Sequence, residues 1–521
     1  MKKKYIYPAL ACLLLGVSSC DKDFEEINTN PIQATALDPI YLFSNAQFGS
    51  ALQTNNYEGE IVQQIITPFT GVVEGGNHNV VIEANANATF NALYQGPIRN
   101  LIDVIAKTKD NPERSNLYNM ARIWKAYDFM VLVDTYGDVP YFEAGKGFLE
   151  STYLPKYDDQ KAIYEDILKE LEDATNKLDA SKDKVTGDLF YGGDIPKWKK
   201  LGNSLLLRAG MRYTELEPAA GGKADQLVDK ALDPARGGVL ASNDDNALLR
   251  FTATYTNATS NQLTATERQN FFVGKPFVDF LKTNNDPRLP YIAVRYSNSS
   301  TPAGGTMNAD PAAQVGMPYG YSDVTLVNAP GYPGKENGTF AYSQFRRNTV
   351  LKLEAPEYFV THAQTQLLLA EAAKRGYIAG GDAAAATYYE NGIRAHLNQM
   401  KDYDATIINI TPEQQQAYLL QPGVAYNSGT ALKQINEQYW VASFRSWSEA
   451  WANFRRSGYP QLAPINYPGE DPSVKTQSAG GFIRRLPYPA REKSVNSANV
   501  AEATTRMGGD NLGVRVFWDK Q

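Results

Sequence analysis

Apolar residues recur at helical spacing along the chain, in segments that follow one another in pairs with short breaks between them. Residues 116–135 carry a stripe with spacings of four, three and four, formed by Met120, Trp124, Tyr127 and Val131. Such spacing places the side chains on one face of an α-helix. An Ala/Leu-rich helix over residues 362–375 stops at Gly376, and another helical stripe follows it. A helix, a glycine turn and a second helix form a helical hairpin, so we predict a scaffold of helix pairs.

The densest stripe consists of aromatic residues with spacings of four, three, four and three: Trp440, Phe444, Trp447, Trp451 and Phe454. Rings that share one helix face bury a large apolar area when that face packs against its neighbours. We therefore interpret the stripe as one face of a core helix. The alternative is an aromatic binding surface.

The helical pattern fades between residues 240 and 356. A short alternating stretch over residues 249–255 predicts a few strands, among segments rich in Asn, Ser, Thr, Gly, Pro and Tyr. Long loops in a compact protein are usually functional or disordered, and the many tyrosines argue against disorder. We find no low-complexity linker. We predict one domain over residues 36–521, with a helical scaffold at 36–240 and 356–460 and a loop-rich insertion at 241–355.

The N-terminus has the layout of a secretory signal peptide over residues 1–19, with three lysines, an apolar run and small residues directly before Cys20. The apolar run is well short of the roughly 20 residues that span a membrane. Cys12 is lost with this leader, so Cys20 cannot form a disulfide within the mature chain. We predict that lipid is attached to Cys20 and that residues 20–35 form a tether. The alternative is an ordinary signal peptide with an incidental cysteine.

The charge balance argues against a nucleic-acid partner. The chain has 51 basic and 57 acidic residues, and loss of Lys2 to Lys4 with the leader leaves 48 against 57, a net charge of −9. Phosphate backbones are bound by clustered basic faces, which an acidic chain with scattered arginines does not supply.

Motifs for chemistry are missing. His78, His362 and His396 are far apart in the sequence, and neither a zinc-protease helix motif, a serine nucleophile elbow nor a phosphate-binding loop occurs. A glycosidase needs only two opposed carboxylates, for which Glu371 is a candidate, but a cap or inter-helix salt bridge is the favoured role for it. No calcium-loop pattern is present. We expect no catalytic residue, no metal and no cofactor.

Several segments resemble the SusD/RagB-like nutrient-binding outer-membrane lipoproteins of Bacteroidetes, in the order in which that family has them. They are CDKDF at residues 20–24, DTYGDVPY at 134–141, NSLLLR at 203–208, LLLAEAAKRG at 367–376, RRSGYP at 455–460 and RRLPYP at 484–489. The match runs through most of the mature chain.

This resemblance implies an all-α fold of tetratricopeptide-like helix pairs with a loop-rich insertion that carries a few short strands. It also implies a surface-exposed lipoprotein of the outer membrane that forms a lid on a SusC-like TonB-dependent barrel. Such lids capture oligosaccharides, or in some branches peptides, and deliver them to the barrel. The chain itself lacks the repeated ten-residue alternating strands of a barrel, so the partner would be a separate protein.

The resemblance places ligand contacts in variable loops, one after the early helices and others in the insertion. No residue motif defines these loops. By position we expect contacts within residues 74–79 and among the tyrosines of the insertion, with Tyr or His stacking on a ring and Asn bonding to hydroxyls. The candidates are Asn77, His78, Tyr296, Tyr319, Tyr321 and Tyr332.

Four functions remain open from the sequence. The first is a glycan-capturing lid and the second is the same lid for peptides, which the absence of tryptophan from the insertion mildly favours. The third is a surface glycoside hydrolase, and the fourth is a structural or adhesive surface protein.

Overall fold

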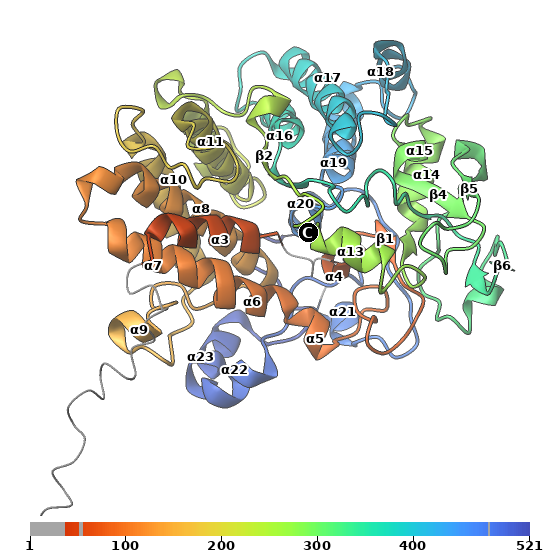
Figure 1. Ribbon diagram of the computed structural model, residues 1–521, viewed down its shortest axis with the longest axis horizontal. Helices are drawn as coiled ribbons and strands as arrows, with labels where there is room; N and C mark the ends of the chain where they lie inside the picture. The colour runs from red at the N-terminus through yellow and green to blue at the C-terminus, as the bar shows by residue number, and fades with distance from the viewer. Residues whose placement is uncertain (1–36, 52–55, 478–479, 521) are drawn as a thin grey trace, which may run out of the picture.

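The structure is a computed structural model that describes residues 37–51, 56–477 and 480–520. It is mostly helical (Figure 1). The leader, Cys20 and the tether at residues 20–35 lie outside the described residues. Within the described ranges, no helix combines the length and the apolar character needed to cross a membrane.

The helices of the N-terminal half are α3 (Pro39–Gly49), α4 (Asn56–Ile61), α5 (Glu83–Ala86), α6 (Ala88–Leu93), α7 (Arg99–Thr108), α8 (Ser115–Tyr136), α9 (Gly147–Glu150), α10 (Gln160–Lys177), α11 (Ile195–Met211) and α12 (Lys223–Leu232). Those that follow are α13 (Ala258–Thr264), α14 (Lys275–Thr283), α15 (Leu289–Ile292), α16 (His362–Lys374), α17 (Gly381–Gln399), α18 (Pro412–Leu419), α19 (Ala431–Ala442), α20 (Trp447–Ser457), α21 (Ser473–Thr476), α22 (Ala490–Val495) and α23 (Ser497–Met507).

The strands are short and form small antiparallel sheets: β1 (Ile65–Ile66) with β3 (Phe272–Val273); β2 (Ala247–Leu249) with β9 (Glu357–Val360); β5 (Met307–Asn308), β4 (Ala293–Tyr296) and β8 (Gln344–Phe345) in that order; and β6 (Lys335–Glu336) with β7 (Thr339–Phe340).

Consecutive helices stack as antiparallel pairs, which confirms the predicted scaffold of helix pairs. Helix α8 packs on α10, α10 on α11 and α11 on α12, while α16 packs on both α17 and α19. The contact between α11 and α16 joins the two halves of the array across the insertion. Figure 1 shows this arc of helices along the left and top of the molecule. Each helix packs against its neighbours in the array, as in a helical solenoid, and the central helices α8, α11 and α16 are buried along most of their residues.

Local sequence signals set the ends of these helices. Helix α16 begins with a capping box, in which the Thr361 hydroxyl accepts from the Gln364 amide at 3.1 Å and the Gln364 side chain accepts from the Thr361 amide at 3.1 Å. It ends before Gly376, whose φ of +83° suits glycine. Helix α8 likewise ends at Tyr136, and Gly137, with φ +75°, leads the chain out of the helix.

The aromatic stripe lies in the core, as predicted, but it does not lie on one helix. Trp440 closes the end of α19 and Trp447 begins α20, with a four-residue connection between them. Arg445 in this connection has φ +69°, and its guanidinium donates to the Val350 carbonyl and to Asn257. The prediction of one continuous helix was therefore wrong, because a buried arginine holds the chain in a left-handed turn that the regular spacing hides.

The insertion contains more helix than its sequence pattern indicates. Helix α14 begins with Pro276 in its first turn and has three of its apolar side chains in the core, yet only the alternating stretch at residues 249–255 suggested regular structure. That stretch contributes only Leu249 to β2, which ends there. Two further short helices, α13 and α15, lie within the insertion.

A second, smaller hydrophobic core underlies part of the insertion. Its buried members are Ile66, Phe272, Met317, Leu326, Ala329, Phe340 and Tyr342. The β1–β3 pairing, Ile65 opposite Val273 and Ile66 opposite Phe272, attaches this core to the chain that follows α4. The insertion is thereby fixed beside the early loop at residues 74–79.

Candidate functional site

Three loops that are far apart in the sequence meet next to the second core. We call residues 74–79, 319–323 and 466–471 together the aromatic loop cluster. The first loop follows α4 and β1, the second belongs to the insertion, and the third leads from α20 to α21. The first two contain predicted ligand residues, so the structure brings these parts of the prediction together.

His78 joins all three loops. Its ring is fully buried; Nδ1 lies 2.9 Å from Glu74 Oε1 and Nε2 lies 3.0 Å from the Tyr321 carbonyl oxygen. The ring of Tyr467 stacks on it, with centroids 3.7 Å apart and planes 12° apart. Because both ring nitrogens and one ring face are occupied by the protein, His78 positions Tyr467 and Tyr321 rather than presenting its own ring to solvent.

Tyr467 is the half-buried ring that the sequence reasoning missed. Burial, with the carboxylates of Glu74 and Asp323 nearby, raises the pKa of its hydroxyl. The hydroxyl therefore stays protonated and can donate a hydrogen bond. The one signal that could have found it is the run of Tyr, Pro, Gly and Asn at residues 458–469, which resembles the composition of the insertion.

Asn77 and Asn79 hold the first loop in place. The Asn77 amide group donates to the Thr67 carbonyl at 2.6 Å and accepts from the Gly75 amide at 2.8 Å. Asn79, with φ +53°, donates to Glu470 Oε2 at 3.0 Å, and its carbonyl accepts from the backbone amide of Asp471. The structure thus gives Asn77 a buried, bonded position beneath the loop surface.

The predicted tyrosines of the insertion fall into two places. Tyr319, Tyr321 and Tyr332 pack half-buried against the second core, and the Tyr319 hydroxyl donates to the Ile65 carbonyl at 2.5 Å. Tyr296 lies apart from them, beneath the guanidinium of Arg347 at 4.4 Å, and its hydroxyl accepts from the Arg347 amide. The loop cluster therefore gathers His78, Tyr319 and Tyr321, with Tyr332 on the same core, and leaves Tyr296 out.

The backbones of the second and third loops lie close together. Gly320 has φ +86°, and a Cβ placed there would lie 3.0 Å from the Asn466 carbonyl oxygen. Only glycine fits both the conformation and the space without strain. This contact fixes Tyr321 and Tyr467 relative to one another.

The cluster can bind but shows no catalytic arrangement. Half-exposed tyrosine rings offer flat apolar faces, and carboxylates and amides around them offer hydrogen bonds. That combination suits the apolar face and polar rim of a sugar ring, or a planar peptide group. Among the described residues, no group of three or more His, Cys, Asp or Glu side chains could hold a metal ion.

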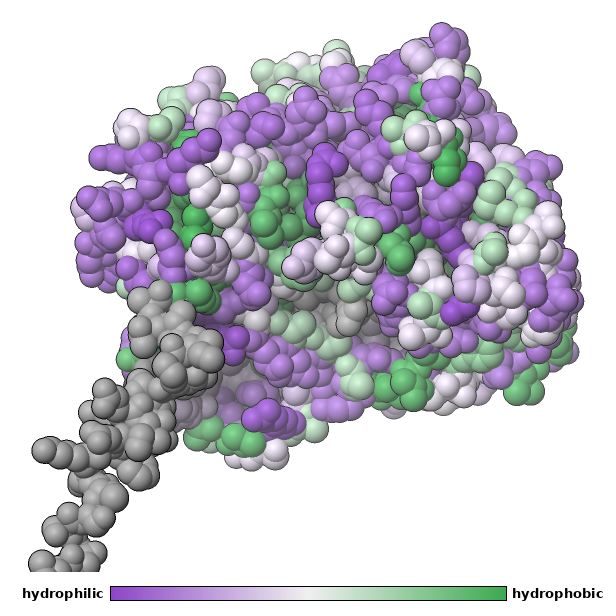
Figure 2. Space-filling model, in the orientation of Figure 1, coloured by the Kyte–Doolittle hydropathy of each residue, from purple (hydrophilic) through white to green (hydrophobic). Residues whose placement is uncertain are grey.

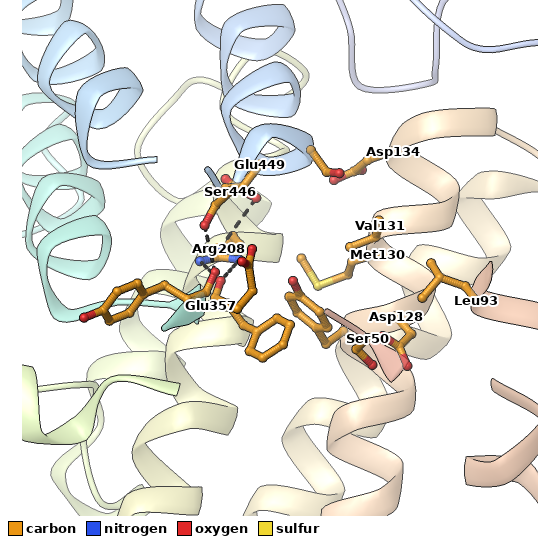
Figure 3. A pocket seen from close by; sticks show the side chains of 14 residues that line it. Ser50, Leu93, Asp128, Met130, Val131, Asp134, Arg208, Glu357, Ser446 and Glu449 are labelled. Carbon is orange, nitrogen blue, oxygen red and sulfur yellow. Dashed lines mark hydrogen bonds and ion pairs between the residues drawn. The ribbon is translucent and has the colours of Figure 1, made fainter. Parts of the chain in front are cut away.

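Four carboxylates of the interior line a small cavity instead (Figure 3). This cavity, between α8 and α20, has a volume of about 40 Å³, room for a few water molecules at roughly 10–15 Å³ each. Its acids and the arginine among them are Asp128, Asp134, Glu357, Glu449 and Arg208. Arg212 pairs with both Asp134 and Glu449, and Arg445 pairs with Glu357. The space is too small for a sugar substrate.

Glu371, the candidate glycosidase acid, is a buried structural ion pair. Its carboxylate oxygens accept from Arg456 at 2.6 and 2.7 Å, from Arg375 at 2.8 Å and from Asn436 at 3.1 Å. Although burial opposes ionisation, Arg456 and Arg375 hold the pKa of Glu371 well below its usual range. Such an acid cannot donate a proton near neutral pH.

Comparison with known proteins identifies proteins that are similar to this chain. A family model described as "starch-binding associating with outer membrane" matches residues 31–489. A solved structure described as a chitin-binding protein is 31% identical, has a TM-score of 0.78, and the alignment covers 93% of this chain and 100% of that one. A Bacteroidetes SusD-like structure is 25% identical with the same TM-score and the same coverage.

A chitin-binding SusD homologue from Flavobacterium johnsoniae shares the fold at 22% identity and a TM-score of 0.70, over 91% of this chain and 98% of that one. Among curated proteins, no sequence matches this chain. The family match spans both halves of the helical array and the insertion between them. The chain therefore belongs to the SusD-like family of non-catalytic, nutrient-binding proteins of the outer membrane.

Proposed function

We propose that this protein captures oligosaccharides at the cell surface and delivers them to a SusC-like TonB-dependent barrel, held to the membrane by lipid on Cys20. The observation that carries the proposal is the aromatic loop cluster, in which a stacked His78–Tyr467 pair and half-buried Tyr321 converge from three loops. The chitin-binding protein that is 31% identical over almost the whole chain supports a glycan as the ligand.

The ligand surface is attached rigidly to the helical array, as delivery by a lid would require. Gln63 donates to the Ala463 carbonyl at 2.7 Å, and Gln64 donates to the Trp440 carbonyl at 2.7 Å. These bonds tie the residues between α4 and β1 to α19 and to the segment that precedes the third loop. A ligand held on the cluster would therefore move with the whole molecule when the lid opens or closes.

A second candidate, capture of peptides, is favoured by the position of the tryptophans. All six, Trp124, Trp198, Trp440, Trp447, Trp451 and Trp518, are buried in the core. Stacking on a ligand therefore falls to tyrosines, whose hydroxyls also suit backbone amides.

Isothermal titration calorimetry of the mature Cys20→Ala chain separates the two ligands. N-acetylchitohexaose, maltohexaose and a mixture of hexapeptides would be titrated in parallel. The glycan proposal expects saturable binding of at least one hexasaccharide and none of the peptides. Binding of peptides alone would replace it with the second candidate.

The delivery role needs a separate measurement. Detergent extraction of outer membranes from cells that produce the lipidated chain should yield the protein together with a large TonB-dependent barrel. Recovery of the protein alone, under conditions that keep it folded, would contradict the role of a lid.

A further inference from the structure

A cavity separate from the aromatic loop cluster lies between α3 and the segment that contains β2. Its volume is about 1020 Å³, at the upper end of the roughly 300–1,000 Å³ usual for small-molecule sites. Its walls come from α3, residues 189–191, residues 243–255 and residues 401–402. We call it the α3 cavity. In Figure 2, hydrophobic residues show green within a hollow between the elements that Figure 1 labels α3 and β2.

Exposed aromatic rings concentrate at this cavity. The described residues include five phenylalanines and tyrosines classed as exposed, and three of them line it: Tyr41 at 63%, Phe48 at 43% and Tyr255 at 67%. Tyr41 and Phe48 lie on α3, and Tyr255 lies on the other wall, beyond β2. Exposed apolar rings gathered at one concave place mark a binding site more often than scattered ones do.

The wall beside α3 is preorganised. Asp188 accepts hydrogen bonds from the backbone amides of Phe190, Tyr191 and Gly193 and, at 2.7 Å, from the Trp198 indole. The side chain of Gln47 on α3 donates to the same carboxylate at 2.8 Å and accepts from the Leu189 amide. The loop that lines the cavity is therefore fixed to α3 before any ligand arrives.

The opposite wall is also held in place. The Thr252 amide donates to the Tyr255 carbonyl at 2.9 Å, and the Tyr255 amide donates to the Thr252 hydroxyl at 3.1 Å. This reciprocal turn presents the Tyr255 ring to the cavity. The backbone that carries the Tyr255 ring is therefore fixed before a ligand binds, which lowers the conformational entropy lost on binding.

Polar groups stand next to the rings. Asn243 lines the cavity, and its side chain donates to the Ala395 carbonyl at 2.9 Å. Arg250 is exposed at the cavity and makes no ion pair with any described residue. A guanidinium without a carboxylate can donate to the hydroxyl and carbonyl oxygens of a sugar.

We propose that the α3 cavity is a second glycan-binding site, which takes a short stretch of neutral oligosaccharide. Sugar faces stack on Tyr41 and Tyr255, and Arg250 donates to ring or carbonyl oxygens of the sugar. The inference rests on the proposed function, because it assigns the same class of ligand to a second place. Two sites on one chain raise the effective concentration of a long glycan at each of them.

The test maps the bound sugar by hydroxyl-radical footprinting of the mature Cys20→Ala chain at saturating N-acetylchitohexaose, maltohexaose or cellohexaose. The inference expects at least one hexasaccharide to reduce oxidation of Tyr41 and Tyr255 several-fold. Tyr153, exposed to 74% and outside the cavity, is the internal control and should react unchanged.

Variants then assign the sites. The Tyr41→Ala/Tyr255→Ala double variant should remove one of two binding events in calorimetry, Tyr467→Ala should remove the other, and Tyr153→Ala should remove neither. Protection of Tyr467 with Tyr41 and Tyr255 fully reactive would overturn the second site and leave the proposed function standing. A Tyr41→Ala/Tyr255→Ala variant that no longer co-purifies with the barrel, but still binds the same number of sugar molecules, would also overturn the second site. Failure of all three sugars to bind anywhere would overturn both.

Discussion

Buried carboxylates in this protein differ in how their charge is balanced. Glu371 has two arginines, and their attraction outweighs its burial. Glu58, buried in α4, has no ion pair among the described residues. Burial raises the pKa of Glu58 to about 7, against the smaller opposing effects of a backbone amide and the Thr89 hydroxyl. At neutral pH the two acids therefore carry different charge.

The Glu58→Gln variant should unfold with less dependence on pH than the natural chain. The pKa of an unfolded glutamate is about 4.3, so folding favours the protonated form of Glu58. The stability that this proton contributes is complete below about pH 4 and is lost as the pH rises through about 7. Denaturant unfolding at pH 5 and pH 8 should show the variant gaining stability relative to the natural chain at pH 8, on the order of 2–3 kcal/mol. The exposed Glu502→Gln variant is the control, and an equal pH slope in all three proteins would refute the role of Glu58.

The Arg456→Met variant should lose about 3–5 kcal/mol of unfolding free energy, because it leaves the buried Glu371 carboxylate with Arg375 as its one remaining ion-pair partner among the described residues. Replacing both residues, as Glu371→Gln/Arg456→Met, should recover part of that loss. Chemical denaturation of the three proteins measures the coupling. If the double variant is no more stable than Arg456→Met, the two residues are not energetically paired.

Helices could be predicted here where their own residues decide them. The stripe at residues 116–135 predicts α8 to within one residue at each end, and Gly376 predicts the end of α16. Arg445 could not be predicted to break the aromatic stripe, since the bonds that hold its left-handed conformation come from Val350 and Asn257.

Loop contacts between distant segments likewise could not be predicted, because the residues of one loop do not decide them alone. His78 and Tyr321 were identified as site candidates by position in the chain, but their contact depends on pairing between distant strands, for which sequence carries no period. Tyr467 was missed because its partner, His78, lies at the other end of the chain. The buried position of Asn77 could not be predicted either, since polar residues in a loop are usually expected to be exposed.

The Gly320→Ala variant should separate the second and third loops of the cluster. The new Cβ would meet the Asn466 carbonyl at 3.0 Å, in addition to the strain of φ +86°, roughly 1–2 kcal/mol. Gly331→Ala is a matched control, with φ +74° and no atom within 4 Å of its added Cβ. Both should be slightly less stable in thermal melts, but only Gly320→Ala should bind the hexasaccharide more weakly. Equal affinity in the two variants would mean that the contact does not shape the site.

At the scale of the whole molecule, the helical array serves as a rigid base for the loops that we propose bind the ligand. One continuous core includes residues from Phe43 to Trp518, so both ends of the described chain pack into the same body. The loops rest on the second core beside it. This division explains why the motifs shared with the family lie mainly in helices and their ends, while the ligand surface has no motif.

Replacement of Cys20 tests the proposed lipid anchor. The Cys20→Ala variant should fold normally and appear in the soluble fraction, because several acyl chains are needed for stable anchoring and none remains. Fractionation followed by immunoblotting measures the distribution. A variant that stays on the cell surface would show that the barrel alone retains it.

The central claim is that the aromatic loop cluster binds the glycan, and titration of Tyr467→Ala tests it most directly. Tyr153→Ala is the control, since it removes an exposed tyrosine from another surface. With the hexasaccharide that the natural chain binds, loss of the Tyr467 ring should weaken binding at the cluster about tenfold or more, ~1.4 kcal/mol, with the melting temperature unchanged within a few degrees. Tyr153→Ala should bind as the natural chain does. Undiminished binding by Tyr467→Ala would contradict the account.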